Sequence, residues 1–277
     1  MRRRCIPAAT LIVALATASA SPAATVRGER SSDASQVWTL RVTASPGELN
    51  TIFVRYVGAI IVTDSVPLTA GADCTTFSDG VTCEQPGYTS AAIEVEAGDL
   101  DDTVTVASGD EIPALLSGGA GDDVLRGSGA SRSLFRYSGG DGDDRMIGGL
   151  GSDIFLEGPA ANGSDVFRSD TGDRRYEDRV VYRERVHGVR ADLDGDADDG
   201  EPGERDRIGP GVESIIGGAG PDRLVGNASA NVLRGAGGND RLRGGRGRDE
   251  IDCGRGFDTV LRDAFDMLRG NCERRRS

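Results

Sequence analysis

Apolar residues recur every nine positions through the C-terminal third of the chain. From residue 208 to residue 261 a frame of nine residues repeats six times without a break, and its eighth position is always apolar. The six apolar residues are Ile215, Leu224, Leu233, Leu242, Ile251 and Val260. Glycines occupy many of the other positions. This spacing predicts very short strands, each with one inward side chain, separated by tight glycine turns.

The sixth position of the same frame always carries an oxygen-bearing side chain. These residues are Glu213, Asp222, Asn231, Asp240, Asp249 and Asp258. Two units make one flattened coil of about 18 residues, because each unit supplies one strand and one turn. Sixth-position residues 18 apart should therefore stack on the same edge. Such a coil buries its inner face only when neighbouring coils complete it, so the pattern predicts an all-β solenoid.

A first repeat block, residues 97–180, follows the same frame with a longer period. Copies that begin 21 residues apart place Asp102, Asp123, Asp144 and Asp165 at position six. Their position-eight residues are Val104, Leu125, Met146 and Phe167, and the intervening copies contribute Leu134 and Phe155. The period equals two nonapeptides with three inserted residues, so we expect these four aspartates on one edge.

The segments outside the repeats have different patterns. Residues 37–96 contain β-branched, partly alternating runs that predict a small antiparallel β domain, with Trp38 in its core. A polar linker, 21–36, precedes it, and a cap and tail, 262–277, follow the nonapeptides of 208–261. Between the two blocks, residues 181–207 are dense in acidic side chains. They predict either a solvated connector or an irregular calcium site through Asp192, Asp194 or Asp196.

The N-terminal pattern predicts that the chain is secreted, and the net charge predicts bound cations. Residues 1–20 have a basic start, a short apolar run and small residues at Ala18 and Ala20, which is typical of a secretory signal peptide. The formal net charge is −13, and removal of that segment with its three arginines would make it −16. Such acidity argues against a nucleic-acid partner and favours bound cations. The apolar run is too short to span a bilayer.

Four cysteines remain after cleavage, and export would allow them to form disulfides. Their spacing favours the local pairs Cys74–Cys83 and Cys253–Cys272, although four cysteines allow three connectivities. Cys5 would leave with the signal peptide.

The turns of the solenoid offer hard oxygen ligands, which suit calcium. An ion between stacked turns would draw a carboxylate from both, so Asp144 should serve an ion on each side. On the opposite edge of the first block, Asp153 should face Arg132 and Arg174 and form salt bridges instead of binding calcium.

The frame Gly-Gly-x-Gly-x-Asp-x-apolar-x resembles the calcium-binding nonapeptide repeats of the RTX family, most specifically over residues 217–261 and less closely over 97–168. The resemblance implies a calcium-binding parallel β-roll, with calcium held by turn carbonyls and the position-six carboxylate. Carried onto this chain, the metal residues are Asp102, Gly118, Gly119, Gly121, Asp123, Gly139, Gly140, Gly142, Asp144, Asp165, Gly217, Gly218, Ala219, Gly220, Asp222, Gly235, Ala236, Gly237, Gly238, Asp240, Asp249, Gly254, Gly256 and Asp258.

Enzyme classes fit the sequence poorly. The single histidine, His187, cannot build the zinc site of the proteases that share these repeats, and no Gly-x-Ser-x-Gly motif occurs. We therefore expect a secreted, non-enzymatic calcium-binding protein with a structural or surface-interaction role. A cell surface or a polysaccharide is a candidate partner, which the sequence does not identify. The alternative is an extracellular lyase or epimerase-like enzyme, which would show an arginine-lined groove near Tyr176, Tyr182 and Arg183.

Overall fold

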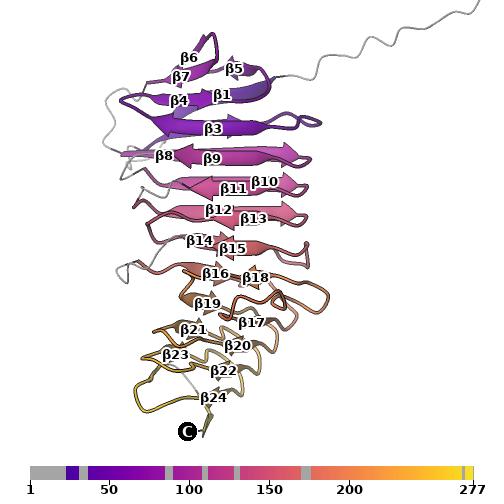
Figure 1. Cartoon of the computed structure of the whole chain (residues 1–277), viewed down its shortest axis with the longest axis vertical. Coiled ribbons are helices and arrows are strands. Elements are labelled where there is room, and N and C mark those ends of the chain that lie inside the picture. Colours follow the sequence, from indigo (N-terminus) through magenta and orange to yellow (C-terminus); the bar gives the residue numbers. More distant parts are fainter. Residues whose placement is uncertain are drawn as a thin grey trace, which may run out of the picture.

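The computed structural model describes residues 23–30, 37–84, 90–107, 112–127, 132–169, 176–269 and 272–276. Within them the chain forms a stack of flattened coils, one above the next along the long axis (Figure 1). The expected signal peptide lies outside the described residues. Among the residues that are described, no helix is long and apolar enough to cross a membrane.

One long sheet runs the whole length of the stack. Its strands, from the N-terminal end, are β5 (Leu68–Ala70), β1 (Ala24–Arg30), β2 (Val37–Thr43), β8 (Ser90–Asp99), β10 (Ala114–Ala120), β12 (Phe135–Asp141), β14 (Ile154–Leu156), β16 (Arg179–Val181), β19 (Ser214–Ile216), β21 (Val232–Arg234), β23 (Glu250–Asp252) and β25 (Met267–Arg269). We call it sheet A. From β2 onward each neighbouring pair is parallel.

The opposite face is made by two sheets. Sheet B contains β6 (Cys74–Phe77), β7 (Gly80–Cys83), β4 (Ile60–Thr63), β3 (Thr51–Tyr56), β9 (Thr103–Ala107), β11 (Val124–Gly127), β13 (Arg145–Ile147), β15 (Val166–Arg168) and β18 (Arg207–Ile208). Sheet C contains β17 (Arg190–Asp192), β20 (Arg223–Val225), β22 (Arg241–Arg243), β24 (Thr259–Leu261) and β26 (Arg274–Arg276). The expected parallel β-roll is therefore confirmed.

The core is a file of inward side chains between the facing sheets. The predicted position-eight residues of the second block are all buried, as are Val104, Leu125, Met146, Phe155 and Phe167 of the first. Leu134 is the exception, because its side chain is 36 % exposed while Phe135 and Tyr137 point inward. Strand β12 is seven residues long, and its alternation starts at Phe135, one residue beyond the predicted inward position. The ring of Tyr137 then stacks on that of Phe155, with centroids 5.1 Å apart.

The N-terminal strands continue the roll. Strands β1, β4, β6 and β7 form the expected antiparallel pairs, and Trp38 is fully buried. However, β2 pairs in parallel with β8, and β3 pairs in parallel with β9. The boundary drawn after residue 96 therefore falls inside β8, and β1 lies in the segment 21–36 that was expected to be a linker. The extended, β-branched segments β2 and β3 can pair with the first coil of the repeats as well as with their antiparallel neighbours.

The acidic segment 181–207 is a crossover and not a solvated connector. The chain leaves β16, forms β17 at the start of sheet C, and then turns back to form β18 at the end of sheet B. Antiparallel bridges between Arg190 and Gly200 and between Asp199 and Asp206 join the two arms. Asp192, Asp199 and Asp206 are buried there. We call residues 182–206 the crossover.

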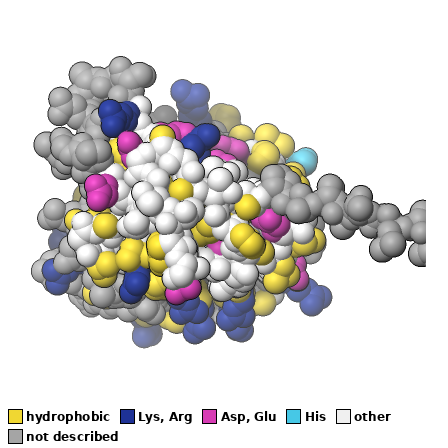
Figure 2. Space-filling model, turned by 90° about the horizontal axis from the view of Figure 1, so that it is seen from above, with side chains coloured by type: hydrophobic (Ala, Val, Ile, Leu, Met, Phe, Trp, Pro, Cys, Tyr) yellow, Lys and Arg dark blue, Asp and Glu magenta, His cyan; other side chains and the backbone are white. Residues whose placement is uncertain are grey.

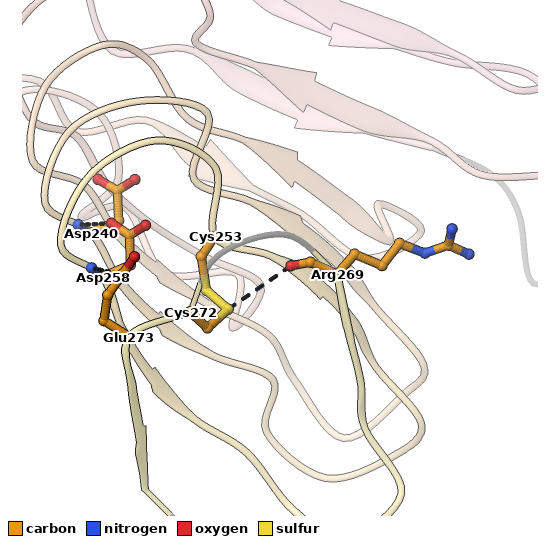
Figure 3. The surroundings of a disulfide bond; sticks show 6 residues. All are labelled: Asp240, Cys253, Asp258, Arg269, Cys272 and Glu273. Atoms are coloured by element: carbon orange, nitrogen blue, oxygen red, sulfur yellow. Dashed lines mark hydrogen bonds between the residues drawn. A yellow bond between two sulfur atoms is a disulfide. The ribbon is translucent and has the colours of Figure 1, made fainter.

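Both predicted disulfides are present. Cys74–Cys83 joins the hairpin strands β6 and β7 at the N-terminal end. Cys253–Cys272 closes the C-terminal end, where Cys253 follows β23 and Cys272 precedes β26 (Figure 3).

Candidate metal sites

The first-block aspartates form a ladder along one edge of the roll. The backbone N–H of Asp102 donates to Oδ1 of Asp123 at 2.8 Å, that of Asp123 to Oδ1 of Asp144 at 2.8 Å, and that of Asp144 to Oδ1 of Asp165 at 2.9 Å. Each carboxylate thus satisfies the backbone of the coil before it. The predicted stacking with a 21-residue period is observed.

The ladder extends beyond the residues that the frame predicted. Asn50 donates its backbone N–H to Asp102 at 2.6 Å, and Asp165 donates to Oδ1 of Asp206 at 3.0 Å. Asp206 comes from the crossover, 41 residues after Asp165, so no fixed period could reveal it. The local signal for Asp206 in the sequence was its position two residues before an apolar residue, Ile208, which is buried in the short strand β18.

The second-block aspartates repeat the arrangement. Asp222 donates its N–H to Oδ1 of Asp240 at 2.8 Å, and Asp240 donates to Oδ1 of Asp258 at 2.9 Å. The chain ends this ladder with Glu273, whose Oε2 accepts from the N–H of Asp258 at 2.8 Å (Figure 3). Glu273 lies outside the nonapeptide frame and replaces a sixth-position aspartate.

The second oxygen of most of these carboxylates has no partner among the described residues. The ladder aspartates are at most 2 % exposed. Nevertheless, no hydrogen bond reaches Oδ2 of Asp102, Asp123, Asp144, Asp240, Asp249 or Asp258. A buried carboxylate oxygen without a donor is costly, so each of these atoms calls for a proton or a cation.

Glycines leave the space in front of these oxygens open. A Cβ atom added at Gly118 would collide with Oδ2 of Asp123, and one added at Gly139 would collide with Oδ2 of Asp144. Gly217 and Gly235 have the same relation to Asp222 and Asp240. The first glycine of each unit therefore keeps the carboxylate facing the backbone of the turn.

Backbone carbonyls line the same turns. A Cβ at Gly119 would meet the carbonyl oxygen of Gly98, and one at Gly140 would meet that of Gly119. A Cβ atom at other predicted turn glycines would also meet a carbonyl oxygen of the preceding coil. These pairs are Gly121 with Leu100, Gly142 with Gly121, Gly238 with Gly220, Gly254 with Ala236 and Gly256 with Gly238. Gly119 and Gly140 have φ values of 117° and 114°, which a side chain would oppose. Stacked carbonyls beside orphan carboxylate oxygens form the hard donor set that calcium prefers.

Burial and repulsion disfavour the charged form of the ladder. Burial raises the pKa of Asp123 to about 7, and the neighbouring carboxylates of Asp144 and Asp102 add to the shift. Burial likewise raises the pKa of Asp144 to about 6 and that of Asp240 to about 7. A metal ion would reverse this preference, because it favours deprotonated ligands.

Two predicted ligands have both oxygens engaged. Oδ2 of Asp222 accepts the N–H of Gly218 at 2.7 Å, and Oδ2 of Asp165 accepts from Asn162 at 3.3 Å. Gly218 and Gly220 lie against backbone atoms of the crossover, at Arg185 and His187, where a nonapeptide turn would otherwise stack. The turn that contains Ala219 therefore has a nonapeptide neighbour only on its C-terminal side, where Gly237 donates its N–H to the carbonyl of Gly218 at 3.0 Å. Ala236 adopts a positive φ of 66° in that neighbouring turn.

The opposite edge differs from its prediction. Asp153 is fully buried, and its oxygens accept the backbone N–H groups of Phe135 at 3.3 Å and Gly149 at 2.8 Å. Its neighbour one coil on is Asp178, which accepts the N–H of Asp153 at 2.6 Å. The coil is 25 residues long here, so the 21-residue period does not place Arg174 beside it; Arg174 lies outside the described residues. Asp153 therefore caps backbone groups within an edge of stacked carboxylates.

Asp249 lies further along this opposite edge, between Asn231 and Asp266. Its Oδ1 accepts the N–H of Asn231 at 2.9 Å, and its own N–H donates to Asp266 at 3.2 Å. Burial raises its pKa to about 6. Asp249 therefore resembles the ladder aspartates, because its Oδ1 accepts a backbone N–H while its Oδ2 has no donor among the described residues.

The acidic crossover gathers carboxylates in a different way from that expected. Asp194 and Asp196 are exposed, whereas Asp192 approaches Asp198 and Asp199. Both oxygens of Asp199 accept backbone N–H groups, from Asp192 at 2.7 Å and Ile208 at 3.1 Å. A second group unites Glu157, Glu204 and Asp206.

Comparison with known proteins agrees with this geometry. The family model for the RTX calcium-binding nonapeptide repeat matches four copies, at residues 115–131, 138–155, 208–242 and 225–260. A search of curated proteins gave no match. The matched copies contain Asp123 and Asp144 of the first ladder and Asp222, Asp240 and Asp258 of the second, together with their glycine turns. Over residues 115–260 the chain is therefore an RTX calcium-binding repeat protein.

Proposed function

We propose that this is a secreted protein whose roll folds on binding calcium and then serves as a structural or surface-interaction module. The observation that carries the proposal is the set of buried Oδ2 atoms without donors in the two ladders. Ions that bind only the folded roll would stabilise it by mass action. Secretion is supported by the two disulfides, which persist in oxidising compartments.

The interaction role is supported by a column of arginines on the outer face of sheet C. Arg190, Arg223 and Arg241 occupy the same register on β17, β20 and β22, and all three are exposed. Like charges directly opposite one another on paired strands are unfavourable. Arg190 is paired with Asp198 at 2.6 Å, so an acidic polysaccharide on a cell surface would chiefly neutralise Arg223 and Arg241. Viewed from above, arginine side chains also project along one margin of the molecule (Figure 2).

The alternative function, a carbohydrate-active enzyme, has one observation in its favour. A groove of about 390 Å³ lies on the outer face of sheet A and is lined by Arg136, Arg179, Arg183 and Glu184, among others. Tyr182, however, is buried and donates its hydroxyl to Asp206 at 3.1 Å, away from solvent. The groove thus offers arginine and glutamate without that tyrosine.

The test is a calcium titration of the chelated protein, followed by circular dichroism, with magnesium as the control. We expect the repeats to lack β-structure without calcium and to gain it at roughly millimolar calcium, because the acidic ladders repel when unoccupied. Magnesium should be less effective, since it tolerates irregular oxygen cages poorly. A spectrum that strong chelation leaves unchanged would contradict the proposal. The folded protein is then mixed with an acidic polysaccharide: binding without cleavage supports the interaction role, and cleavage supports the enzyme.

A further inference from the structure

The crossover contains a buried cluster of carboxylates around a single base. Arg185 is fully buried after β16, and its Nη2 contacts Oε2 of Glu157 at 2.7 Å and Oε1 of Glu204 at 2.9 Å. Its Nη1 is 3.7 Å from Oε1 of Glu201. The side chain of Glu157 is wholly buried, and that of Glu204 is 3 % exposed. Arg185 thus holds these acidic side chains on one side of the cluster.

One guanidinium cannot balance this cluster. Asp206 lies beside Glu157 and Glu204, and their ligand atoms are all within 4.8 Å of one another. Asp165, at the end of the first ladder, donates its N–H to Asp206 and is close enough to Glu157 for a hydrogen bond if one of the two carboxyl groups were protonated. Buried carboxylates outnumber the base, and an uncompensated buried charge is strongly destabilising.

A second observation points to a missing ligand. Oε1 of Glu157 is buried and accepts no hydrogen bond from any described residue. The other carboxylate oxygens of the group already accept hydrogen bonds: Oε2 of Glu157 from Arg185, Oε1 and Oε2 of Glu204 from Arg185 and the N–H of Glu201, and Oδ1 and Oδ2 of Asp206 from Asp165 and Tyr182. Among these three carboxylates, Oε1 of Glu157 is therefore the oxygen that lacks a donor from the described residues.

We propose that a divalent cation binds at the crossover between Glu157, Glu204 and Asp206. Calcium is the ion that the donors select, because all are carboxylate oxygens, with no nitrogen or sulfur among them. Glu157 follows β14, while Glu204 and Asp206 precede β18, so the ion joins the end of the first block to the arm that returns from sheet C. This site lies outside the nonapeptide turns, although its ligand Asp206 also accepts the N–H of Asp165 at the end of the first ladder.

Tyr182 provides a local reporter for this site. Its hydroxyl donates to Oδ2 of Asp206, so a terbium ion in the cluster would lie close enough for energy transfer from the excited phenol. Three variants of the full chain separate the possibilities. Glu157→Gln removes the charge of the proposed ligand, Tyr182→Phe removes the reporter, and Asp123→Asn is the matched control in a nonapeptide turn.

We expect Glu157→Gln to bind one calcium ion fewer than the parent chain, with loss of the terbium emission that Tyr182→Phe also removes. Asp123→Asn should lose calcium but keep that emission, so failure of the nonapeptide sites is distinguished from failure of this one. If Glu157→Gln does not fold in calcium, Asp206→Asn replaces it, since the amide oxygen can still accept the N–H of Asp165. An unchanged calcium count with unchanged emission overturns the site and indicates a proton shared between Glu157 and Asp165.

Discussion

Each ladder aspartate has two oxygens with separate tasks. In Asp144, Oδ1 accepts the backbone N–H of Asp123, and Oδ2 has no protein donor. In Asp153, both oxygens accept backbone N–H groups. The sequence frame predicts the residue type at both positions but not how each oxygen is used, because that depends on the length of the next coil.

Replacing these two aspartates by asparagine should affect different properties: calcium binding at residue 144 and stability at residue 153. Asp144→Asn keeps an oxygen for Asp123 but loses the charge, so calcium binding on both sides of residue 144 should weaken. Its content of β-structure without calcium should stay the same or rise. Asp153→Asn places an amide donor against the N–H of Gly149, which should lower stability by about 1–3 kcal/mol without changing the calcium count. Isothermal titration and thermal melts at pH 8 check both; equal loss of calcium in the two variants would refute the one-sided metal edge.

At the scale of the element, a ladder is a row of carboxylates whose charges interact. The 21-residue period correctly predicted which strands of the first block stack, as the register of Gly98, Gly119 and Gly140 shows. The same period failed in sheet A beyond Tyr137, whose partner Phe155 is 18 positions on, and Phe155 in turn pairs with Val180, 25 positions on. Loops of variable length interrupt a sequence period but not a stack, since only the strands and turns must align.

The ladders should make the stability of the calcium-free roll depend on pH. The pKa of Asp123 is about 7 and that of Asp144 about 6 in the folded chain, against about 4 for an unfolded aspartate. The folded state therefore holds more protons between these values, so its stability is greatest below about pH 4 and is lost as the pH rises through about 7. Each unit of pKa difference corresponds to about 1.4 kcal/mol.

Without calcium, the repeats should consequently retain more β-structure at pH 5 than at pH 8. In saturating calcium the order of stability should reverse, because protons then compete with the ion for the same oxygens. Circular dichroism of the calcium-free protein and thermal melts of the calcium-loaded protein, in matched buffers, provide the measurement. The same pH order in both conditions would show that the ladders do not hold the ion.

At the scale of the whole molecule, the described coils stack in order, and each strand pairs with the strands of the neighbouring coils. The sequence predicted the roll because every unit repeats its own local signal. It did not predict that β2 and β3 form the first coil, since their residues lack the nonapeptide frame. Nor did it predict the crossover, whose buried Arg185 and Asp206 lie beside Glu157, because these three residues are separated in sequence and resemble ordinary surface residues when taken singly.

The placement of the disulfides determines where such a stack comes apart. Solenoids usually fray from their ends, but here Cys74–Cys83 cross-links the hairpin at the N-terminal end, and Cys253–Cys272 links the last coils at the C-terminal end. The weakest seam is then the middle, where sheet B stops at β18 and sheet C starts at β17, with only sheet A continuous across it. On partial chelation, amide hydrogen exchange should accelerate first at residues 182–206 and later at the two termini. The molecule would thus open at its middle, with sheet A still joining the two halves. Loss of protection first at the two ends would rule this out.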